Sequence, residues 1–493
     1  MAGDVRMKLT VDLWKHQVEM LDFIMGRFEG QDIVPLGFPS SKYAYLIAGC
    51  RTGKTLTAIA AAEPFERTLV ITKQPAIASA WKKELSQRTE DVDYVLLDKK
   101  VETRDGLIKG VTKSSDKAAF LRDYIPSSKQ SITVVNYETA KLILPTLAAL
   151  KPEYVVLDES HIIKSHNSGI SQELAMELRQ VPHKLEMTGT SWNDRPTDLF
   201  GQVRFFAPYR SGRAVASRHL GTWTKFFDTH VNYWVEDNVK IPKDYKELDK
   251  LTTMLNEFTM YVRTEDVIDL PEANHLEYVL PMPAKMEKAY KDLERNMVAK
   301  FGDDLFIADN VLVQGLRLHQ LTGGYYVNEE GQVVEYLDPS ENPKLQALLE
   351  IVDEAGHEPL VVFTRFKHDV VIIERALRNQ GIATKQLTGG KHEHVEWQEG
   401  AGQVLIANIQ AGGTGVTLNR ANLVVYYSVG HSATDYEQSL WRVRDAAQER
   451  PIFYHNLMIG DSIDMAIRGA ISTKGVVSEF MLSHMQNRLT GVR

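Results

Sequence analysis

The chain has 493 residues, which predicts two or three domains at about 150 residues each. Its 57 Lys and Arg against 65 Asp and Glu give a formal net charge of −8. This charge excludes a protein that coats nucleic acid by bulk positive charge, so a nucleic-acid site has to be a local basic patch. The apolar runs are far shorter than the ~18 residues of a membrane helix, and the N-terminal residues lack the apolar core of a signal peptide. The single cysteine, Cys50, excludes a disulfide framework and a cysteine-based zinc site. We expect a cytoplasmic protein with no membrane partner.

Short β-branched runs, each followed by a turn and a helical stretch, recur along the chain. The predicted strands are residues 43–48, 68–72, 132–135, 154–157 and 184–187, and then 360–364, 403–407 and 423–427. Predicted helices between them include residues 55–62, 76–88 and 370–380. Strands that alternate with helices predict parallel sheets covered on both faces, in an α/β fold.

The alternation fades between about residues 205 and 342, where residues 245–261 and 284–301 show helical periodicity and many charges. Pro271 and Pro343 mark segment boundaries, because the residue before a proline is pushed out of the helical conformation. The prediction is therefore two lobes with helical insertions near their junction. Lobe one is residues 1–268 with an insertion at about 205–268, and lobe two is residues 269–493 with an insertion at about 284–340.

A phosphate-binding loop is predicted directly after the first strand, in the segment Ala48-Gly49-Cys50-Arg51-Thr52-Gly53-Lys54-Thr55. Phosphate binds to backbone N–H groups at a helix N-terminus, where a glycine permits close approach and a lysine meets the outer phosphates. The threonine hydroxyl that follows can ligate Mg²⁺. Ala48 replaces the first glycine of the strict pattern, and the alternative is a chance Gly-Lys-Thr turn that begins an ordinary helix.

An acid pair, Asp158 and Glu159, follows the apolar run 154–157. A carboxylate at the carboxyl end of a buried strand can hold Mg²⁺, and its neighbour can activate the attacking water. An isolated Asp-Glu pair is usually a solvated turn. Downstream of a phosphate-binding loop it is interpreted as a Walker B pair.

The acid pair also carries a family resemblance. Asp158-Glu159-Ser160-His161 resembles motif II of the superfamily-two helicases, and residues 162–165 resemble its continuation in Swi/Snf-type DNA translocases. Further segments resemble motifs of that family in the family's order, namely residues 13–17, 69–73, 188–193, 263–267, 317–320, 361–365, 411–418 and 438–448. The resemblance covers about residues 10–470 and implies two tandem RecA-like lobes in a compact member of bacterial or phage type.

The resemblance implies that ATP and Mg²⁺ are the cofactors. Lys54, Asp158 and Glu159 would act in catalysis, Thr55 and Asp158 would hold the metal, and Gln17 would select adenine. The remaining nucleotide-binding residues implied in lobe one are Gly49, Cys50, Arg51, Thr52 and Gly53. Those implied in lobe two are Gly413, Gly415 and Arg442, with Arg444 as a further catalytic candidate.

Motif VI departs from the family pattern. Arg442 fits the first arginine, but Asp445 stands where the second is expected, and Arg444 comes one position early. A shift of one residue on a helix rotates a side chain by ~100°. Three alternatives stay open: local geometry brings Arg444 in, Arg442 alone supplies the charge, or turnover is weak.

Contacts to a nucleic-acid backbone use Lys, Arg, hydroxyls and helix N-termini. The positions that match the family's motifs are Lys73, Trp81, Asn136, Tyr137, Lys164, Thr364, Arg365, Gln410 and Thr414. Each has an ordinary alternative: Trp81 can belong to the core, and Lys73 can be a solvated loop end.

The resemblance implies an ATP-dependent motor that translocates on double-stranded DNA, remodelling DNA or displacing bound proteins. We expect a monomer that is nucleoid-associated, or in the host cytoplasm if viral. Two alternatives stay open: a true helicase that unwinds branched DNA or RNA, and a nucleotide-gated DNA-binding clamp with weak turnover, which Asp445 suggests.

Overall fold

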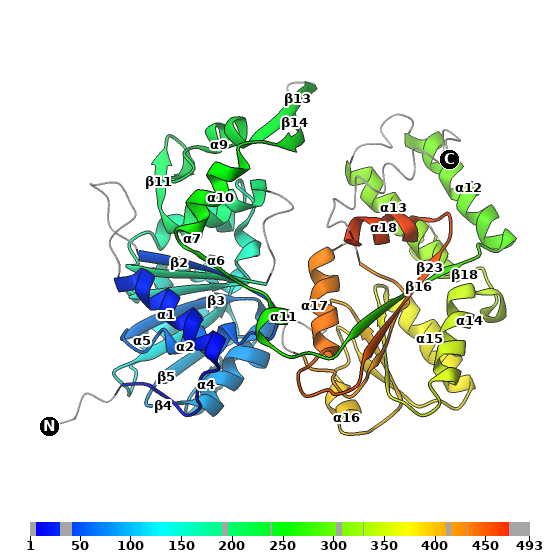
Figure 1. The fold of residues 1–493 in the computed structure, drawn as a ribbon, viewed down its shortest axis with the longest axis horizontal. Coiled ribbons are helices and arrows are strands. Elements are labelled where there is room, and N and C mark those ends of the chain that lie inside the picture. Colours follow the sequence, from blue (N-terminus) through cyan, green and yellow to red (C-terminus); the bar gives the residue numbers. More distant parts are fainter. Residues whose placement is uncertain are drawn as a thin grey trace. The chain divides into compact units, whose positions relative to one another are not determined.

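The computed structural model describes residues 6–29, 42–189, 196–236, 239–301, 308–328, 330–410, 416–430 and 432–472. The chain divides into two compact units, Met1–Ile268 and Asp269–Arg493. Unit 1 is drawn from blue to green and unit 2 from green to red in Figure 1. The division lies just before Pro271, where helix α11 (Thr264–Val267) has already ended. Within the described ranges, every helix is too short or too polar to cross a bilayer.

The described part of unit 1 contains a nine-stranded sheet. From one edge to the other its strands are β15 (Thr259–Val262), β2 (Lys42–Ala48), β10 (His183–Thr188), β9 (Tyr154–Asp158), β3 (Arg67–Thr72), β8 (Ser131–Asn136), β5 (Asp93–Leu97), β6 (Val101–Thr103) and β7 (Gly106–Ile108). The strands from β15 to β5 pair in parallel, whereas β6 and β7 add antiparallel strands at one edge. The carboxyl ends of the parallel strands therefore all lie at the same end of the sheet, which is called its carboxyl edge below.

Helices cover both faces of this sheet because side chains along a strand alternate between the faces. Tyr43 and Tyr45 of β2 join one apolar cluster, and Ala44 and Leu46 join the other. The first face is covered by α6 (Tyr137–Ala149), α7 (Gly169–Glu177) and α8 (Leu199–Phe206). The second is covered by α1 (Lys15–Glu29), α2 (Lys54–Ala60) and α4 (Lys82–Arg88), which lie side by side in Figure 1.

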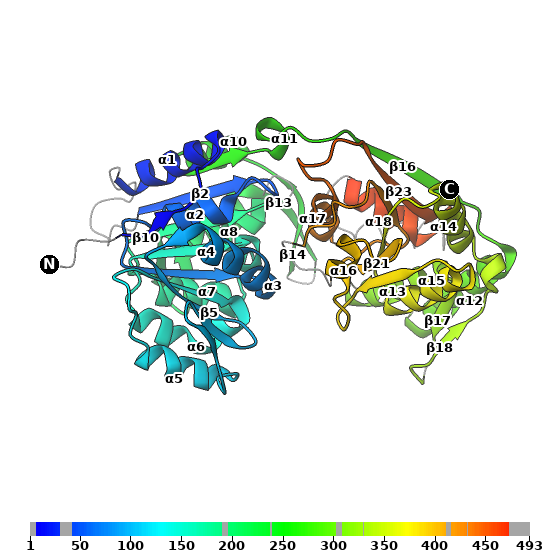
Figure 2. The same cartoon turned by 90° about the horizontal axis from the view of Figure 1, so that it is seen from below.

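The described part of unit 2 contains a six-stranded parallel sheet. Its order is β16 (Ala273–Leu280), β23 (Ile452–Ile459), β22 (Leu423–Tyr426), β19 (Leu360–Thr364), β21 (Val404–Asn408) and β20 (Thr384–Leu387). Figures 1 and 2 both show β16 beside β23. One face packs on α14 (Pro343–Glu354) and α15 (Lys367–Asn379), and the other on α13 (Ala308–Thr322), α17 (Ala433–Val443) and α18 (Ile463–Ser472). The predicted α/β fold with helix-covered parallel sheets is confirmed.

The segment expected to be a helical insertion of the first lobe is only partly helical. It holds α9 (Trp223–His230) and α10 (Leu248–Asn256), but also the hairpins β11 (Pro208–Ser211)–β12 (Ala214–Ser217) and β13 (Val231–Glu236)–β14 (Val239–Tyr245). The helix predicted over residues 245–261 was wrong at its C-terminal end, because β15 pairs with β2 there. Pairing with β2 stabilises this segment as a strand, but β2 is far away in the sequence, so the local pattern does not show the pairing.

The corresponding segment of unit 2 is closer to expectation. Helix α12 (Ala284–Phe301) begins at the predicted residue and α13 follows it, with a small hairpin formed by β17 (Tyr325–Val327) and β18 (Val333–Glu335). Asn342 accepts a hydrogen bond from the Leu345 N–H at 3.3 Å and thereby caps α14, with Pro343 as its first residue. The predicted boundary at Pro343 is therefore a helix start.

Two residues fix the position of α8, one against the sheet and one against the segment that follows the acid pair. The buried Lys184 of β10 donates from Nζ to the Phe205 and Phe206 carbonyl oxygens, both at 3.1 Å, and so satisfies the C-terminal end of the helix. Burial lowers the pKa of Lys184 to about 7. At Gly201 the helix touches the backbone after the acid pair, since a Cβ there would lie 1.9 Å from the Ile163 carbonyl oxygen. A glycine is therefore required at this crossing.

We predict that Gly201→Ala destabilises unit 1 by about 3 kcal/mol, because the new methyl group meets backbone that cannot move aside. Gly26→Ala in α1 is the matched control, since a Cβ there meets nothing within 4 Å. That variant should be stabilised by up to about 1 kcal/mol. Thermal unfolding followed by circular dichroism measures both. Equal melting temperatures for the two variants would contradict the close approach.

Candidate active site

The phosphate-binding loop joins the carboxyl end of β2 to the first residue of α2. Gly53, at φ +79°, is the N-cap of α2, and Arg51 also has a left-handed backbone at φ +65°. Gly49 permits a close approach to α11, because a Cβ there would lie 2.1 Å from Thr264 Oγ1. The Thr264 hydroxyl in turn donates to the Cys50 carbonyl oxygen at 2.8 Å. The start of α11 therefore supports the loop from outside.

Lys54 lies over this loop. Its Nζ donates to the Ala48 and Gly49 carbonyl oxygens at 2.6 and 2.8 Å, and Thr52 Oγ1 donates to the Gly49 carbonyl oxygen at 2.9 Å. Thr55 is the second residue of α2 and is half-buried. Lys54 and Thr55 are the first two residues of α2, whose first turn presents N–H groups without partners inside the helix.

Gln17, at the start of α1, packs against the same loop. Its Oε1 accepts a hydrogen bond from the Trp14 N–H at 2.8 Å, and a Cβ at Gly53 would lie 1.8 Å from its Nε2. The neighbouring His16 places Nε2 3.0 Å from the Thr52 carbonyl oxygen. The fold therefore brings the residue expected to select adenine to the phosphate-binding loop.

Asp158 ends β9 at the same edge of the sheet and is 7% exposed. Its Oδ2 accepts hydrogen bonds from Thr72 Oγ1 at 2.8 Å and from Trp81 Nε1 at 3.0 Å. Burial and the adjacent Glu159 raise the pKa of Asp158, while these two hydrogen bonds and the charge of Lys54 oppose the rise. Two hydrogen bonds thus hold the Asp158 carboxylate through one oxygen, and the charge of Lys54 acts on it.

The pKa of Glu159 shifts in the direction opposite to that of Asp158. Its backbone is left-handed, at φ +56°, and its Oε2 lies 3.2 Å from His161 Nδ1. Burial acts to raise the pKa of Glu159, but the hydrogen bond and charge of His161, with the charges of Lys54 and Lys73, outweigh burial and lower the pKa to about 2. The two neighbouring carboxyls therefore have pKa values pushed in opposite directions, a pattern typical of paired catalytic acids.

The structure places three of the predicted nucleic-acid residues in buried positions near the acid pair. Trp81 is 1% exposed and its indole N–H binds Asp158, and the buried Tyr137 donates from its hydroxyl to the Asp158 carbonyl oxygen at 3.0 Å. The buried Asn136 caps α6 by accepting from the Thr139 N–H at 2.7 Å. These side chains build the acid site and its supporting helix rather than a surface. The alternative that placed Trp81 in the core agrees with this burial.

Sequence reasoning missed three supporting residues, Thr72, His161 and Thr264. Thr72 could have been found, because it ends the strand next to the one that carries Asp158. His161 stands two positions after Glu159, but its sequence position does not show that the ring turns back to the carboxylate. Thr264 is 214 residues from Cys50, and its contact follows from the pairing of β15 with β2.

The other two candidates of unit 1 are more accessible. Lys73 follows β3 and is half-buried, and its charge acts on Glu159. Lys164 follows the 3-10 helix Ser160–Ile163 and forms an ion pair with Asp198, with Nζ and Oδ2 2.9 Å apart. Both stand at the strand edge that carries the acid pair.

In unit 2, Thr364 ends β19 and is buried, and Arg365 follows it in a half-buried position. Burial lowers the pKa of Arg365, against the charge of Asp435, and Gln410 donates from Nε2 to Asp435 Oδ2 at 3.3 Å. Arg365 and Gln410 are thus brought together around Asp435. Thr414, Gly413 and Gly415, like residues 190–193 of unit 1, lie outside the described residues.

The motif VI residues do not share a helix. Arg442 lies on α17 and is 5% exposed, but α17 ends at Val443. Arg444 is in an extended conformation, with Nε donating to the Pro271 carbonyl oxygen at 3.0 Å and its guanidinium over the Trp441 ring. The Asp445 carboxylate accepts from the Ala447 N–H at 2.9 Å in the following turn. The helical rotation of ~100° expected between Arg444 and Asp445 therefore does not apply.

A phosphate-binding loop and a buried acid pair at the carboxyl edge of a parallel sheet define a P-loop nucleoside triphosphatase. Comparison with known families identifies the family to which this triphosphatase belongs. The model of the SNF2-related domain matches residues 19–322, and that of the helicase conserved C-terminal domain matches residues 343–446. The chain belongs to the SNF2-related family, within helicase superfamily two of Swi/Snf type, and it is a nucleic-acid-dependent ATPase. The predicted resemblance is confirmed.

Individual relatives are distant. Protein p41 of Acyrthosiphon pisum secondary endosymbiont phage 1 is 23% identical over 378 residues, which cover 74% of this chain and 79% of that protein. The Bos taurus DNA annealing helicase and endonuclease ZRANB3 is 23% identical over 387 residues, which cover 73% of this chain but 33% of that protein. A solved Sulfolobus solfataricus SWI2/SNF2 ATPase core in complex with dsDNA is 18% identical, with a TM-score of 0.42, covering 96% of this chain and 94% of that one.

We predict that His161→Ala moves the acidic limb of the pH profile of ATP hydrolysis to higher pH. In its predicted role Glu159 accepts a proton and therefore has to be ionised, and the loss of the His161 hydrogen bond and charge raises its pKa from about 2. The rate should therefore fall at a pH where the wild type is still fully active. His161→Gln keeps a donor without the charge and should shift the limb less.

The pH profile of kcat from pH 4.5 to 8 measures this effect. His166→Ala is the matched control, because His166 stacks on Trp223 and is not among the groups that shift the pKa of Glu159. Identical acidic limbs for His161→Ala and wild type would show that His161 does not set the ionisation of Glu159.

Proposed function

We propose that the chain binds ATP with Mg²⁺ in unit 1 and hydrolyses ATP to translocate as a monomer on double-stranded DNA, remodelling DNA or displacing bound proteins. The observation that carries this proposal is the acid pair: Asp158 held by two donors beside Lys54, and Glu159 ionised at its side. The family supplies the general statement of an ATP-dependent DNA motor. The name of the relative ZRANB3 describes a DNA annealing helicase, which supports DNA as the polymer.

The nucleotide-site residues of unit 1 described above each receive a role in this proposal. The backbone of the loop from Gly49 to Gly53 and the Lys54 amine bind the phosphates, and Gln17 selects adenine. Glu159 orients the attacking water and accepts its proton. The role of Gln17 is supported by its packing against Gly53.

The residues also fit Mg²⁺. Both hydrogen-bond donors on Asp158 use Oδ2, which leaves Oδ1 for a cation, and the half-buried Thr55 offers its hydroxyl. Carboxylate and hydroxyl oxygens are the ligands that Mg²⁺ prefers. When bound, Mg²⁺ neutralises charge on the phosphate oxygens.

Unit 2 contributes cations in the same proposal. Arg442 and Arg444 are the candidates for the charge that stabilises the transferred phosphoryl group, an effect that can reach 10³–10⁵ in rate. Arg444 combines partial exposure with a defined position, since the Pro271 carbonyl oxygen and the Trp441 ring hold its guanidinium. Lys73, Lys164, Arg365 and Gln410 are the proposed contacts to the DNA backbone.

One observation favours the unwinding alternative. The β13–β14 hairpin carries Trp234, which is 49% exposed, and Val235, which is 61% exposed. An exposed aromatic ring on a projecting hairpin can stack on an unpaired base. The polymer that stimulates ATP hydrolysis separates the two functions.

We predict that duplex DNA stimulates ATP hydrolysis more than single-stranded DNA or RNA does, and that Lys54→Ala lowers the stimulated kcat by about 100-fold or more. The lysine donates to charge that grows on the phosphate oxygens in the transition state, so its loss acts on kcat. Steady-state phosphate release measures all three polymers with both proteins. Lys83→Ala, which removes an exposed lysine from α4, should retain the wild-type rate.

Stimulation chiefly by RNA or single strands would replace the duplex motor with an unwinding enzyme. DNA binding without hydrolysis on any polymer would leave the nucleotide-gated clamp. Equal rates for Lys54→Ala and Lys83→Ala would show that the loop described above is not the catalytic site.

A further inference from the structure

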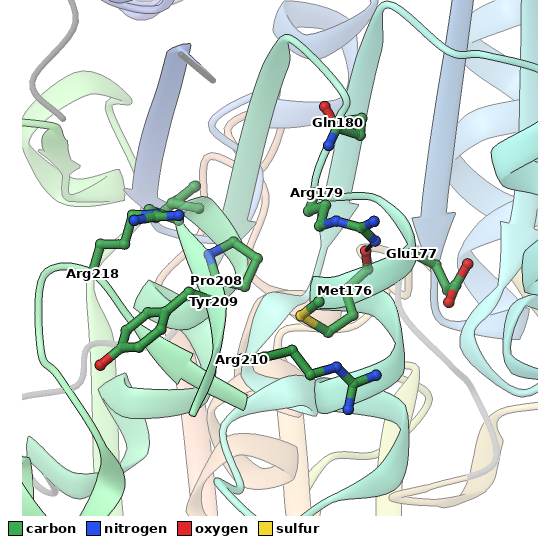
Figure 3. A pocket seen from close by; sticks show the side chains of 10 residues that line it. Met176, Glu177, Arg179, Gln180, Pro208, Tyr209, Arg210 and Arg218 are labelled. Atoms are coloured by element: carbon green, nitrogen blue, oxygen red, sulfur yellow. Dashed lines mark hydrogen bonds between the residues drawn. The ribbon is translucent and has the colours of Figure 1, made fainter. Parts of the chain in front are cut away.

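The arginines of this chain are held in more than one way. Two that line a cavity of unit 1 are held through their guanidinium groups, as Figure 3 shows. Arg179 donates from Nη1 to the Met176 carbonyl oxygen at 2.6 Å. The Arg218 guanidinium lies 5.7 Å from the centre of the Tyr209 ring. Arg365 of unit 2 differs, because side chains bind both its backbone N–H and its carbonyl oxygen.

Arg365 is the first residue after β19, where the backbone hydrogen bonds of the sheet come to an end. On one side, the Tyr427 N–H donates to the Phe363 carbonyl oxygen at 3.0 Å. On the other side, the Ile409 N–H donates to the Thr364 carbonyl oxygen at 2.9 Å. The next two polar groups along the chain, the N–H and the carbonyl oxygen of Arg365, bind side chains. The place of Arg365 therefore depends on which side chains those are.

Ser428 binds the N–H of Arg365. It lies two residues after β22 and is buried, and its Oγ accepts from that N–H at 2.8 Å. The same hydroxyl donates to Oδ2 of Asp369, which is buried in the first turn of α15. The Tyr325 hydroxyl donates to the other oxygen of Asp369 at 3.0 Å. Ser428 therefore connects Arg365 to a buried carboxylate that is itself held in place.

Asn408, the last residue of β21, binds the carbonyl oxygen of Arg365. Its Nδ2 donates to that oxygen at 2.7 Å, and its Oδ1 accepts from the Gln410 N–H at 3.0 Å. The nitrogen of a side-chain amide only donates and the oxygen only accepts, so both bonds require this one orientation. A single amide group thus fixes the backbone at Arg365 and at Gln410, two of the proposed contacts to DNA.

The path of the Arg365 side chain is restricted as well. A Cβ at Gly430 would lie 3.0 Å from Arg365 Nη1, so the guanidinium passes close to a residue that has no side chain. The guanidinium also lies 5.7 Å from the centre of the Phe366 ring. Because the side chain is half-buried, a shift of its backbone changes where its charged end meets the solvent.

We propose that Ser428 and Asn408 are positioning residues for DNA binding: they hold the backbone of Arg365 from both sides and thereby place its guanidinium for a phosphate group of the duplex. The inference rests on the proposed function, in which Arg365 contacts DNA. A guanidinium binds phosphate oxygens through directed, charge-assisted hydrogen bonds, so the affinity depends on its orientation. Ser428 is buried, and its effect on DNA affinity passes through Arg365.

A double-mutant cycle tests the proposal, with fluorescence anisotropy of a labelled DNA duplex titrated with the full chain. Arg365→Ala should raise the Kd at least about tenfold, because it removes charge-assisted hydrogen bonds to phosphate. Ser428→Ala should raise the Kd about fivefold, because the Arg365 N–H loses its acceptor. In the Arg365→Ala background, Ser428→Ala should change the Kd by less than about twofold, since no guanidinium is left to position.

Ser462→Ala is the matched control. Ser462 is another buried serine of unit 2. Its hydroxyl bonds locally, donating to the Ile459 carbonyl oxygen at 2.7 Å and accepting from the Asp464 N–H at 3.2 Å. Its removal also deletes a buried hydroxyl with two hydrogen bonds, but the Kd should stay unchanged. Ser428→Thr, which keeps a hydroxyl, should bind the duplex within about twofold of the wild type.

Asn408→Ala tests the other side of Arg365 and does not depend on the folding of Ser428→Ala. The Arg365 carbonyl oxygen and the Gln410 N–H both lose their partner, so the Kd should rise at least about fivefold. Thermal unfolding followed by circular dichroism shows which variants are folded at the temperature of the titration.

A rise in Kd for Ser428→Ala that persists in full in the Arg365→Ala background would place the effect of Ser428 elsewhere and overturn the inference. Unchanged Kd values in folded Ser428→Ala and Asn408→Ala proteins, beside a raised Kd in Arg365→Ala, would also overturn it and leave Arg365 as a DNA contact. An unchanged Kd in Arg365→Ala would remove that contact from the proposed function, and the inference with it. The expected cycle without stimulation of ATP hydrolysis by duplex would overturn the motor and support the inference.

Discussion

The burial of one carboxylate, Asp158, organises much of unit 1. An ionised carboxylate that leaves water is costly unless hydrogen bonds replace its hydration. Thr72 supplies one donor from the neighbouring strand, and Trp81 supplies the other from the segment that follows that strand. Tyr137, at the start of α6, fixes the backbone of Asp158 through its carbonyl oxygen. Three elements are thereby tied to the position of a single side chain.

The same constraint separates the two carboxyls chemically. The donors on Asp158 orient it without cancelling the effect of burial, so its pKa stays raised, whereas the contact with His161 keeps Glu159 ionised. A left-handed backbone at Glu159 lets consecutive residues face different surroundings. One carboxylate can then hold a cation while its neighbour accepts a proton, a division of roles that two equivalent acids could not support.

Much of this site is predictable because its parts are local in sequence. The loop from Gly49 to Thr55 and the pair Asp158–Glu159 each follow a strand that the apolar pattern identifies, and parallel strands bring their carboxyl ends together. The burial of Trp81 and the support of the loop by Thr264 depend instead on contacts across 77 and 214 residues. Helix α17 ends at Val443, so the spacing of arginines, which assumes a continuous helix, could not show where Arg444 lies.

The most direct test of this account is the Mg²⁺ dependence of ATP hydrolysis in Trp81→Phe. Phenylalanine keeps an apolar ring in the core but removes the N–H that donates to Asp158 at 3.0 Å. The account predicts that the Mg²⁺ concentration for half-maximal activity rises about tenfold, because the carboxylate that we propose to bind the metal loses one of its two donors. ADP binding without Mg²⁺ should be unchanged. An unchanged Mg²⁺ requirement in a folded Trp81→Phe protein would contradict the claim that the buried donors position Asp158 for the metal.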